Sequence, residues 1–320
     1  MNTCRICGNP DGNRDFVARE MMFGLRHPFD YFQCGRCECL QIREFPADMA
    51  PYYPANYYSM EAELPGPKGL PLDAWRRLDS RFRLGVCNYG HTKRREIFDW
   101  LRESGAGYDS EILDVGCGRG KLLHEFHLDG FRKLTGLDPF IAHDLSYPNG
   151  IRIHKRELFD HQGSYQLIMM HHSFEHMPDQ LRTLEAASRL LRPGGTLLIR
   201  IPVVSSFVWR EYGTDWYQLD APRHFYLHSR KSVSVIAERA GFRVDKVVFD
   251  SKAAQFWGSE QYRNDIPHRS PRSYGENPKG SMFTPGRIRE FARRSRELNR
   301  AEDGDAACFY LRRKEAPDAD

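Results

Sequence analysis

The sequence of 320 residues has no apolar run long enough to cross a membrane, and its mean hydropathy is -0.64. Residues 1–12 lack the apolar region of a signal peptide, so we expect a cytoplasmic protein. No internal repeat and no dense stripe of lysine and arginine is present, and the formal net charge is only +4. This charge permits an anionic small molecule as a ligand and does not demand nucleic acid.

The length and the cysteine count set further bounds. A chain of 320 residues can hold one large α/β domain plus a small module. In a cytosolic protein, eight cysteines suggest metal binding before disulfides, because cytosolic thiols are kept reduced.

The most informative stretch is a short apolar strand that turns into a helix on glycines. Residues 112–115 read as a buried strand, Gly116, Gly118 and Gly120 form the turn, and helical character follows. Such a turn brings backbone N–H groups and a helix N-terminus against a ligand. The spacing G-x-G-x-G differs from the G-x-G-x-x-G fingerprint of dinucleotide-binding proteins.

Two acidic residues decide which ligand we expect. Asp114 precedes the first glycine and would repel a pyrophosphate, but it suits the ammonium and sulfonium groups of S-adenosylmethionine. Asp138 ends the next apolar run, about 20 residues on, where a ribose-binding carboxylate is expected. Together with the glycines, the two acids predict an S-adenosylmethionine site. A Rossmann-type turn that binds a nucleotide, or nothing, is the alternative.

At these residues the chain resembles the class I S-adenosylmethionine-dependent methyltransferases, whose first motif reads much like the LDVGCGRG of this sequence. The resemblance implies an α/β protein with a Rossmann-like sheet of seven strands. After the first two strands we expect further strands at 151–154, 165–170, 196–201 and 242–249, and a last antiparallel strand at 306–312. The main helices are expected at 72–84, 91–104, 180–191, 232–240 and 287–300.

Two cysteine pairs near the N-terminus predict a closed zinc site. Cys4-x-x-Cys7 and Cys34-x-x-Cys37 can place four thiolates on one ion. Cys39 could replace Cys37, although C-x-x-C is the better chelating geometry, and a set of free buried thiols is the alternative. The module resembles the N-terminal zinc modules of some bacterial methyltransferases, including sugar-modifying ones.

These features divide the chain into three parts. We expect a zinc-ribbon module at 1–48, a linker and helical segment at 49–90, and a methyltransferase domain at 91–320. An insertion at about 259–305 interrupts the last pair of strands, and the sequence assigns it no task. The linker tyrosines, Tyr52, Tyr53, Tyr57 and Tyr58, either cover the active site or pack the ribbon against the main domain.

Three histidines are candidates for the catalytic base. His172 and His176 follow the fourth expected strand, and the Glu-His-Met around His176 resembles a segment of many small-molecule methyltransferases. The resemblance places His172 at cofactor or substrate contacts. His224 lies in an aromatic loop with Asp220 and Arg223, a set that suits a sugar ring and a phosphate. We predict His224 as the substrate-side group. A structural role in positioning the loop is the alternative for His224 and the favoured role for His176.

The segment after the fourth strand also bears on the substrate. It lacks the Asn/Asp-Pro-Pro-aromatic motif of DNA adenine methyltransferases, which disfavours nucleic acid, and the histidines show no metal-ligand spacing. We therefore predict methyl transfer to a small molecule, a sugar or nucleotide-linked sugar in polysaccharide or natural-product assembly. The alternatives are an RNA or protein methyltransferase that docks through the ribbon, and a non-catalytic cofactor-binding protein.

Overall fold

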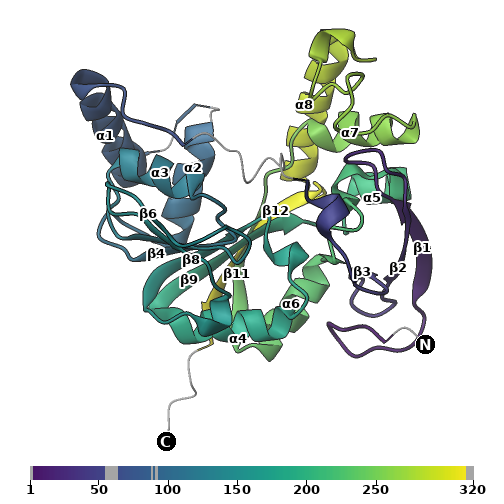
Figure 1. Cartoon of the computed structure of the whole chain (residues 1–320), viewed down its shortest axis with the longest axis horizontal. Helices are drawn as coiled ribbons and strands as arrows, with labels where there is room; N and C mark the ends of the chain where they lie inside the picture. Colours follow the sequence, from purple (N-terminus) through teal and green to yellow (C-terminus); the bar gives the residue numbers. More distant parts are fainter. Residues whose placement is uncertain (1–2, 55–63, 88, 91–92, 315–320) are drawn as a thin grey trace, which may run out of the picture.

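The computed structural model describes residues 3–54, 64–87, 89–90 and 93–314. Its larger sheet has eight strands (Figure 1). In spatial order they are β11 (Phe242–Phe249), β12 (Ala306–Arg313), β9 (Leu191–Pro202), β8 (Tyr165–His171), β4 (Ile112–Val115), β5 (Leu134–Leu137), β7 (Arg152–His154) and β6 (Leu145–Ser146).

The directions of these strands confirm the Rossmann-like sheet that the resemblance implied. β9, β8, β4, β5 and β7 run parallel, and β12 is antiparallel to both of its neighbours, β9 and β11. These strands and β11 are the seven that the family resemblance implied. The short β6 is an addition that pairs antiparallel with β7 at the edge.

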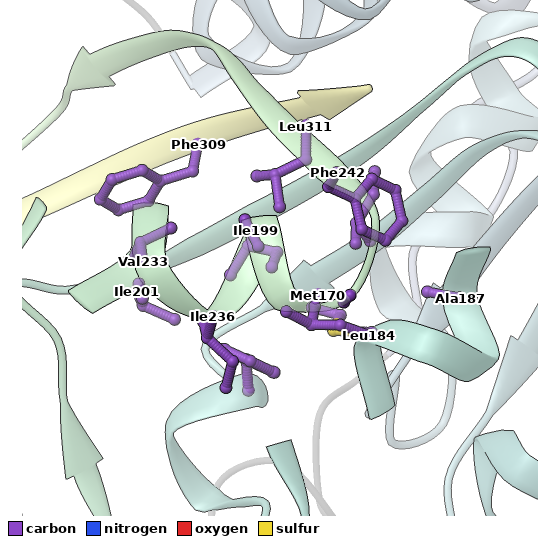
Figure 2. Close-up of a cluster of buried hydrophobic side chains, with 14 of the residues drawn as sticks. Met170, Leu184, Ala187, Ile199, Ile201, Val233, Ile236, Phe242, Phe309 and Leu311 are labelled. Carbon is purple, nitrogen blue, oxygen red and sulfur yellow. The ribbon is translucent and has the colours of Figure 1, made fainter. Parts of the chain in front are cut away.

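Both faces of the large sheet are covered by helices, which is why its central strands are apolar on both sides. In β8, Ile168 and Met170 join one core cluster, and Leu167 and Met169 join another. The first cluster lies under α4 and α6, as Figure 2 shows, and the second lies under α2 and α3. These helices are α2 (Lys93–Ser104), α3 (Lys121–Asp129), α4 (Gln180–Leu190) and α6 (Arg230–Arg239).

The ends of α6 follow from local chemistry. The Ser229 hydroxyl accepts a hydrogen bond from the Ser232 N–H at 3.0 Å, which satisfies one of the unpaired amides at the helix start. After the helix, Gly241 adopts a positive φ of 79°, a conformation that glycine reaches without a steric cost. The chain then enters β11 directly.

A second sheet of four strands joins the N-terminal module to the rest of the chain. It has the order β1 (Arg14–Arg19), β2 (Pro28–Gln33), β3 (Leu40–Ile42) and β10 (Tyr226–Leu227). The first three strands come from the expected ribbon, but β10 belongs to the aromatic loop that carries His224. The sequence did not predict this pairing.

Segments before β10 and after β11 support the N-terminal sheet. Trp216, Phe256 and Phe291 share a third core cluster with Tyr31 and with α5, α7 and α8. Backbone N–H groups of residues 268 and 269 also donate to the carbonyls of residues 21 and 22 at 2.9 and 2.8 Å. The expected insertion therefore holds the small sheet in place. The helices are α5 (Phe207–Tyr212), α7 (Ala254–Arg263) and α8 (Pro285–Arg300), of which only α8 was expected.

The segment before the large sheet forms α1 (Leu70–Gly85) and α2, close to the two expected helices. Tyr57 and Tyr58, and residues 91–92 at the expected start of the second helix, lie outside the described residues. No helix among the described ranges is long and apolar enough to cross a membrane. The division into parts at 1–48, 49–90 and 91–320 stays a prediction.

Candidate functional site

The glycine turn after β4 is packed closely on both sides. Gly116, Gly118 and Gly120 have positive φ values of 76°, 55° and 81°, which explains the need for glycine. A Cβ atom at Gly116 would lie 2.4 Å from Ser173 Cβ, and one at Gly120 would lie 2.5 Å from Ile153 Cδ1. The turn lies at the carboxyl ends of β4 and β5, where open α/β sheets bind ligands.

The two acids expected to bind the cofactor lie at this turn. Asp138 Oδ2 accepts a hydrogen bond from the Gly118 N–H at 2.8 Å, and Oδ1 accepts one from the Phe140 N–H at 2.9 Å. Asp114 is only 4 % exposed. Burial, and then the charge of Asp138, raise the pKa of Asp114 to about 8, so it is mostly protonated at neutral pH when no cation is near.

The three candidate histidines surround one buried carboxylate, Glu175. His172 Nδ1 lies 3.4 Å from Glu175 Oε1, and His224 Nε2 lies 3.9 Å from it. The His176 and His224 rings meet edge to face, with centroids 4.7 Å apart. Burial, followed by the charge of Arg200, lowers the pKa of His172. Burial also lowers the pKa of His176, to about 4.

Backbone geometry holds this cluster beside the glycine turn. Ser173, next to His172, donates its hydroxyl to the Val115 carbonyl at 2.8 Å, and the Phe225 N–H donates to the Glu175 carbonyl at 2.9 Å. The structure thus brings the end of β8 and the aromatic loop together. It also shows that residues without any metal-ligand spacing in the sequence converge in space.

The expected role of Arg223 as a phosphate ligand is wrong. Its side chain is fully buried, ion-paired with Glu20 at 3.0 Å and with Asp220 at 2.6 Å, and donates to the Tyr52 carbonyl at 3.1 Å. Trp216 in the same loop is fully buried too, with its indole N–H bonded to Asp305 at 3.0 Å. Both side chains stabilise the fold and offer no surface to a ligand.

The linker and the N-terminal module both reach the histidines directly. The Tyr53 hydroxyl lies 3.3 Å from His176 Nδ1, and the Tyr31 hydroxyl donates to the His224 carbonyl at 2.9 Å. Tyr52 is mostly buried against Phe29 and His27 of the same module. Of the linker tyrosines, Tyr52 thus packs inside and Tyr53 lies at the cluster. No local pattern pointed to Glu20, which is distant in the chain, and only the Glu-His pair pointed to Glu175.

The N-terminal cysteines converge as a metal site requires. The sulfur atoms of Cys4 and Cys37 are 3.6 Å apart, those of Cys7 and Cys34 are 3.5 Å apart, and all four lie within 4.8 Å of one another. Four thiolates around zinc at about 2.3 Å are separated by roughly 3.8 Å, so the set fits zinc. Cys39 is not among these four, and its buried thiol donates to the Leu40 carbonyl.

The turns that hold the thiolates differ between the two cysteine pairs. Gly8 follows the first pair with a φ of 73°, but after the second pair the left-handed residue is Glu38, with a φ of 64°. Gly35 is needed for another reason. A Cβ atom there would lie 2.5 Å from the Gly12 carbonyl oxygen.

Comparison with known proteins bears on this site. Residues 89–247 match the family model described as a methyltransferase domain. These residues belong to the methyltransferase family. The methyltransferase domain contains the glycine turn, both acids and all three histidines. The expected family is confirmed, and the strand order of the large sheet agrees with the class I fold.

Curated relatives share part of this domain. A ubiquinone biosynthesis O-methyltransferase of Sodalis glossinidius is 32 % identical over 106 residues, which is 30 % of this chain. One from Bordetella avium is 29 % identical over 163 residues, which is 45 % of this chain. The matched regions span 42 % and 66 % of these relatives.

Among solved structures, the mycolic acid cyclopropane synthase CmaA1, in complex with S-adenosylhomocysteine, is similar with a TM-score of 0.44 and 17 % identity. The match covers 69 % of this chain and 84 % of that one. A possible histamine N-methyltransferase from Thermotoga maritima has a TM-score of 0.41 and 15 % identity, covering 76 % and 98 % of the two chains.

Proposed function

We propose that this protein transfers a methyl group from S-adenosylmethionine to a hydroxyl oxygen of a small molecule. The observation that carries the proposal is the contact between Asp138 and the Gly118 N–H, which joins the two halves of the cofactor motif. The match of residues 89–247 to a methyltransferase domain supports it, and relatives named as O-methyltransferases favour oxygen as the acceptor.

The chain offers one partner for the ribose of this cofactor and another for its ammonium group. Asp138 uses one lone pair of each oxygen for a backbone N–H, and the remaining lone pairs can accept the two ribose hydroxyls. Asp114, buried at the same turn, is ionised by the approach of an ammonium group, because an opposite charge offsets the burial that raises its pKa. A pyrophosphate would meet two carboxylates here.

The acceptor binds, in this proposal, at the cluster of His172, His176, His224 and Glu175. Hydrogen-bonding side chains surround it, including the Tyr53 hydroxyl, which favours an acceptor rich in hydroxyl groups such as a sugar. Since the Arg223 guanidinium is already paired with Glu20 and Asp220, the phosphate of a nucleotide-linked sugar needs another partner. Of the expected nucleotide-linked sugar, the cluster therefore suits the sugar ring and not the phosphate.

Methyl transfer from a sulfonium is an in-line displacement, so the protein mainly holds the acceptor oxygen, the methyl carbon and the sulfur in line. Such positioning supplies roughly 7 kcal/mol or more. We place His224 as the residue that acts on the acceptor oxygen. Its Nδ1 donates to the Gln218 carbonyl at 2.8 Å, which leaves Nε2 with a free lone pair. His172 and His176 orient the same region.

We also propose that Cys4, Cys7, Cys34 and Cys37 hold a structural zinc ion. The amide N–H of Gln41 donates to Cys4 Sγ at 2.9 Å, and the backbone N–H of Cys37 donates to Cys34 Sγ at 3.4 Å, contacts that favour thiolates. The ion fixes the sheet whose side chains reach the histidine cluster.

A screen with methyl-labelled S-adenosylmethionine tests the proposed function. Sugars and nucleotide-linked sugars are offered first, then phenols, and label in a small-molecule product is expected. Asp138→Asn should lose cofactor binding, measured by titration calorimetry, while Asp109→Asn, an exposed acid before β4, should keep it. His224→Gln should bind the cofactor normally and transfer at least about 100-fold more slowly. No heat with the cofactor would refute the proposal.

A further inference from the structure

The buried carboxylate of Glu175 has the His172 and His224 imidazoles beside it, at ion-pair rather than hydrogen-bond distance. Glu175 is fully buried, and neither of its side-chain oxygens has a hydrogen bond within the described part of the chain. The contact with His172 Nδ1, at 3.4 Å, is longer than an ordinary N–H···O bond. An ionised carboxylate in this position is costly unless a cation pairs with it. The carboxylate can therefore accept a cation.

Two imidazoles beside Glu175 are held as metal ligands are held. The Nδ1 atoms of His176 and His224 each lie 2.8 Å from a backbone carbonyl, of Arg223 and Gln218 respectively. Carbonyl oxygens only accept hydrogen bonds, so Nδ1 carries the hydrogen and Nε2 keeps its lone pair. A metal-bound histidine characteristically donates its other ring N–H in this way, which fixes the tautomer and the ring.

The distances fit one ion after the side chains close on it. Ligand atoms at about 2.1 Å from a tetrahedral zinc ion lie roughly 3.4 Å apart. His224 Nε2 and Glu175 Oε1 are 3.9 Å apart, and one ligand atom from each of Glu175, His176 and His224 lies within 4.8 Å of the others. The closure required is therefore at most roughly 1.4 Å. The Phe225 N–H bond to the Glu175 carbonyl already ties the two loops together.

We propose that Glu175, His176 and His224 bind a divalent transition-metal ion of the zinc class, with one coordination position open to the acceptor. Two imidazoles and one carboxylate are the ligand set of catalytic zinc sites, whereas the four cysteines form a closed structural set. The side chain of His172, 35 % exposed, marks the side from which an acceptor reaches Glu175.

The role of this ion rests on the proposed function. The acceptor hydroxyl binds at the open position, and the ion lowers its pKa, so that the O–H bond breaks and the proton leaves to water. The oxygen then attacks the methyl carbon. An O–C bond forms, the S–C bond breaks, and its electron pair stays on sulfur, which becomes a neutral thioether. His224 thereby acts as a ligand that sets the position of the acceptor oxygen.

Zinc content, measured on the purified full chain after equilibration with micromolar free zinc, tests the site. The unaltered protein should hold about two zinc ions per chain, and Glu175→Gln and His224→Gln should each hold about one. Asp109→Asn is the matched control and should hold two. Calorimetry with S-adenosylmethionine shows that each variant is folded, and His176→Gln replaces any variant that is not.

A second measurement separates the two zinc sites. With Co²⁺ in place of zinc, the cysteine site gives intense thiolate charge-transfer absorption, and the nitrogen and oxygen site gives only weak visible bands that the Glu175→Gln variant should lose. One zinc ion in the unaltered protein, with no change on Glu175→Gln, would overturn the metal site. That result leaves the proposed function standing, since cofactor binding and methyl transfer are measured independently of the zinc count.

Discussion

Between pH 6.0 and 7.5, the affinity for S-adenosylmethionine should rise steeply because of Asp114. With a pKa of about 8, Asp114 in the free protein is ionised in about 1 % of molecules at pH 6.0 and in about a quarter at pH 7.5. If the cofactor's ammonium group requires the ionised form, binding should strengthen by about 20-fold over this range, or roughly 2 kcal/mol. The range ends at pH 7.5 because α-amino groups themselves lose a proton near about 7.7–8.0.

Titration calorimetry at four pH values, with Asp114→Asn as the comparison, measures this effect. The variant has no proton to release, so its weaker binding should be nearly independent of pH. Proton uptake by the buffer should also appear in the heat measured for the unaltered protein in buffers of different ionisation enthalpy. A change of less than twofold between pH 6.0 and 7.5, or an equal slope in the variant, would refute the assignment of Asp114 to the ammonium group.

The stability of the free protein should show the opposite trend. The pKa of Asp114 is raised in the folded state, so the stability contributed by its protonated form is complete below the unfolded value of 3.8. This contribution decreases as the pH rises through about 8. Thermal unfolding without cofactor should therefore show a higher Tm for Asp114→Asn than for the unaltered protein at pH 8.5.

Three further substitutions have matched controls. Gly116→Ala should weaken cofactor binding by at least about tenfold, because the added Cβ would meet Ser173. Gly194→Ala is the control, since Gly194 has a similar φ of 72° but no atom within 4 Å of an added Cβ, and its affinity should not change. Equal affinities of the two variants would contradict the close packing of the turn. Cys34→Ser should remove about one zinc ion per chain, and Cys39→Ser should leave the zinc content unchanged. Arg223→Met should cost about 3–5 kcal/mol in urea unfolding, because Glu20 and Asp220 stay buried without it. The exposed ion pair of Arg26 and Asp265 is the control, and Arg26→Met should lower the free energy of unfolding by less than about 1 kcal/mol.

The parts of the fold that the sequence predicted depend on local patterns. β4 and β11 have the expected bounds, and in β4 a short, largely apolar run before a glycine turn defines a buried strand. The glycine turn and Asp138 were found because their spacing is local and chemically specific. α7 was not predicted, since its sequence is mixed in polarity and gains its stability from the third core cluster.

What the sequence could not predict depends on contacts between distant residues. β10 pairs with β3 across almost 190 residues of chain, and Arg223 pairs with Glu20 across 203 positions. No local pattern in the sequence marks these pairings. Arg223 was therefore expected to face a ligand, but in the structure two carboxylates enclose it. The convergence of Glu175, His176 and His224 is of the same kind, because it follows from the way two loops meet.

A crystal structure of the protein with S-adenosylhomocysteine would test the central claim most directly. The quantity to measure is the distance from the two ribose hydroxyl oxygens to the Asp138 carboxylate, which we expect to be about 2.5–3.0 Å for both, with the amino group of the ligand beside Asp114. A ribose that lies more than about 4 Å from Asp138, or a phosphate-bearing ligand on the Gly116–Gly120 turn, would contradict the account.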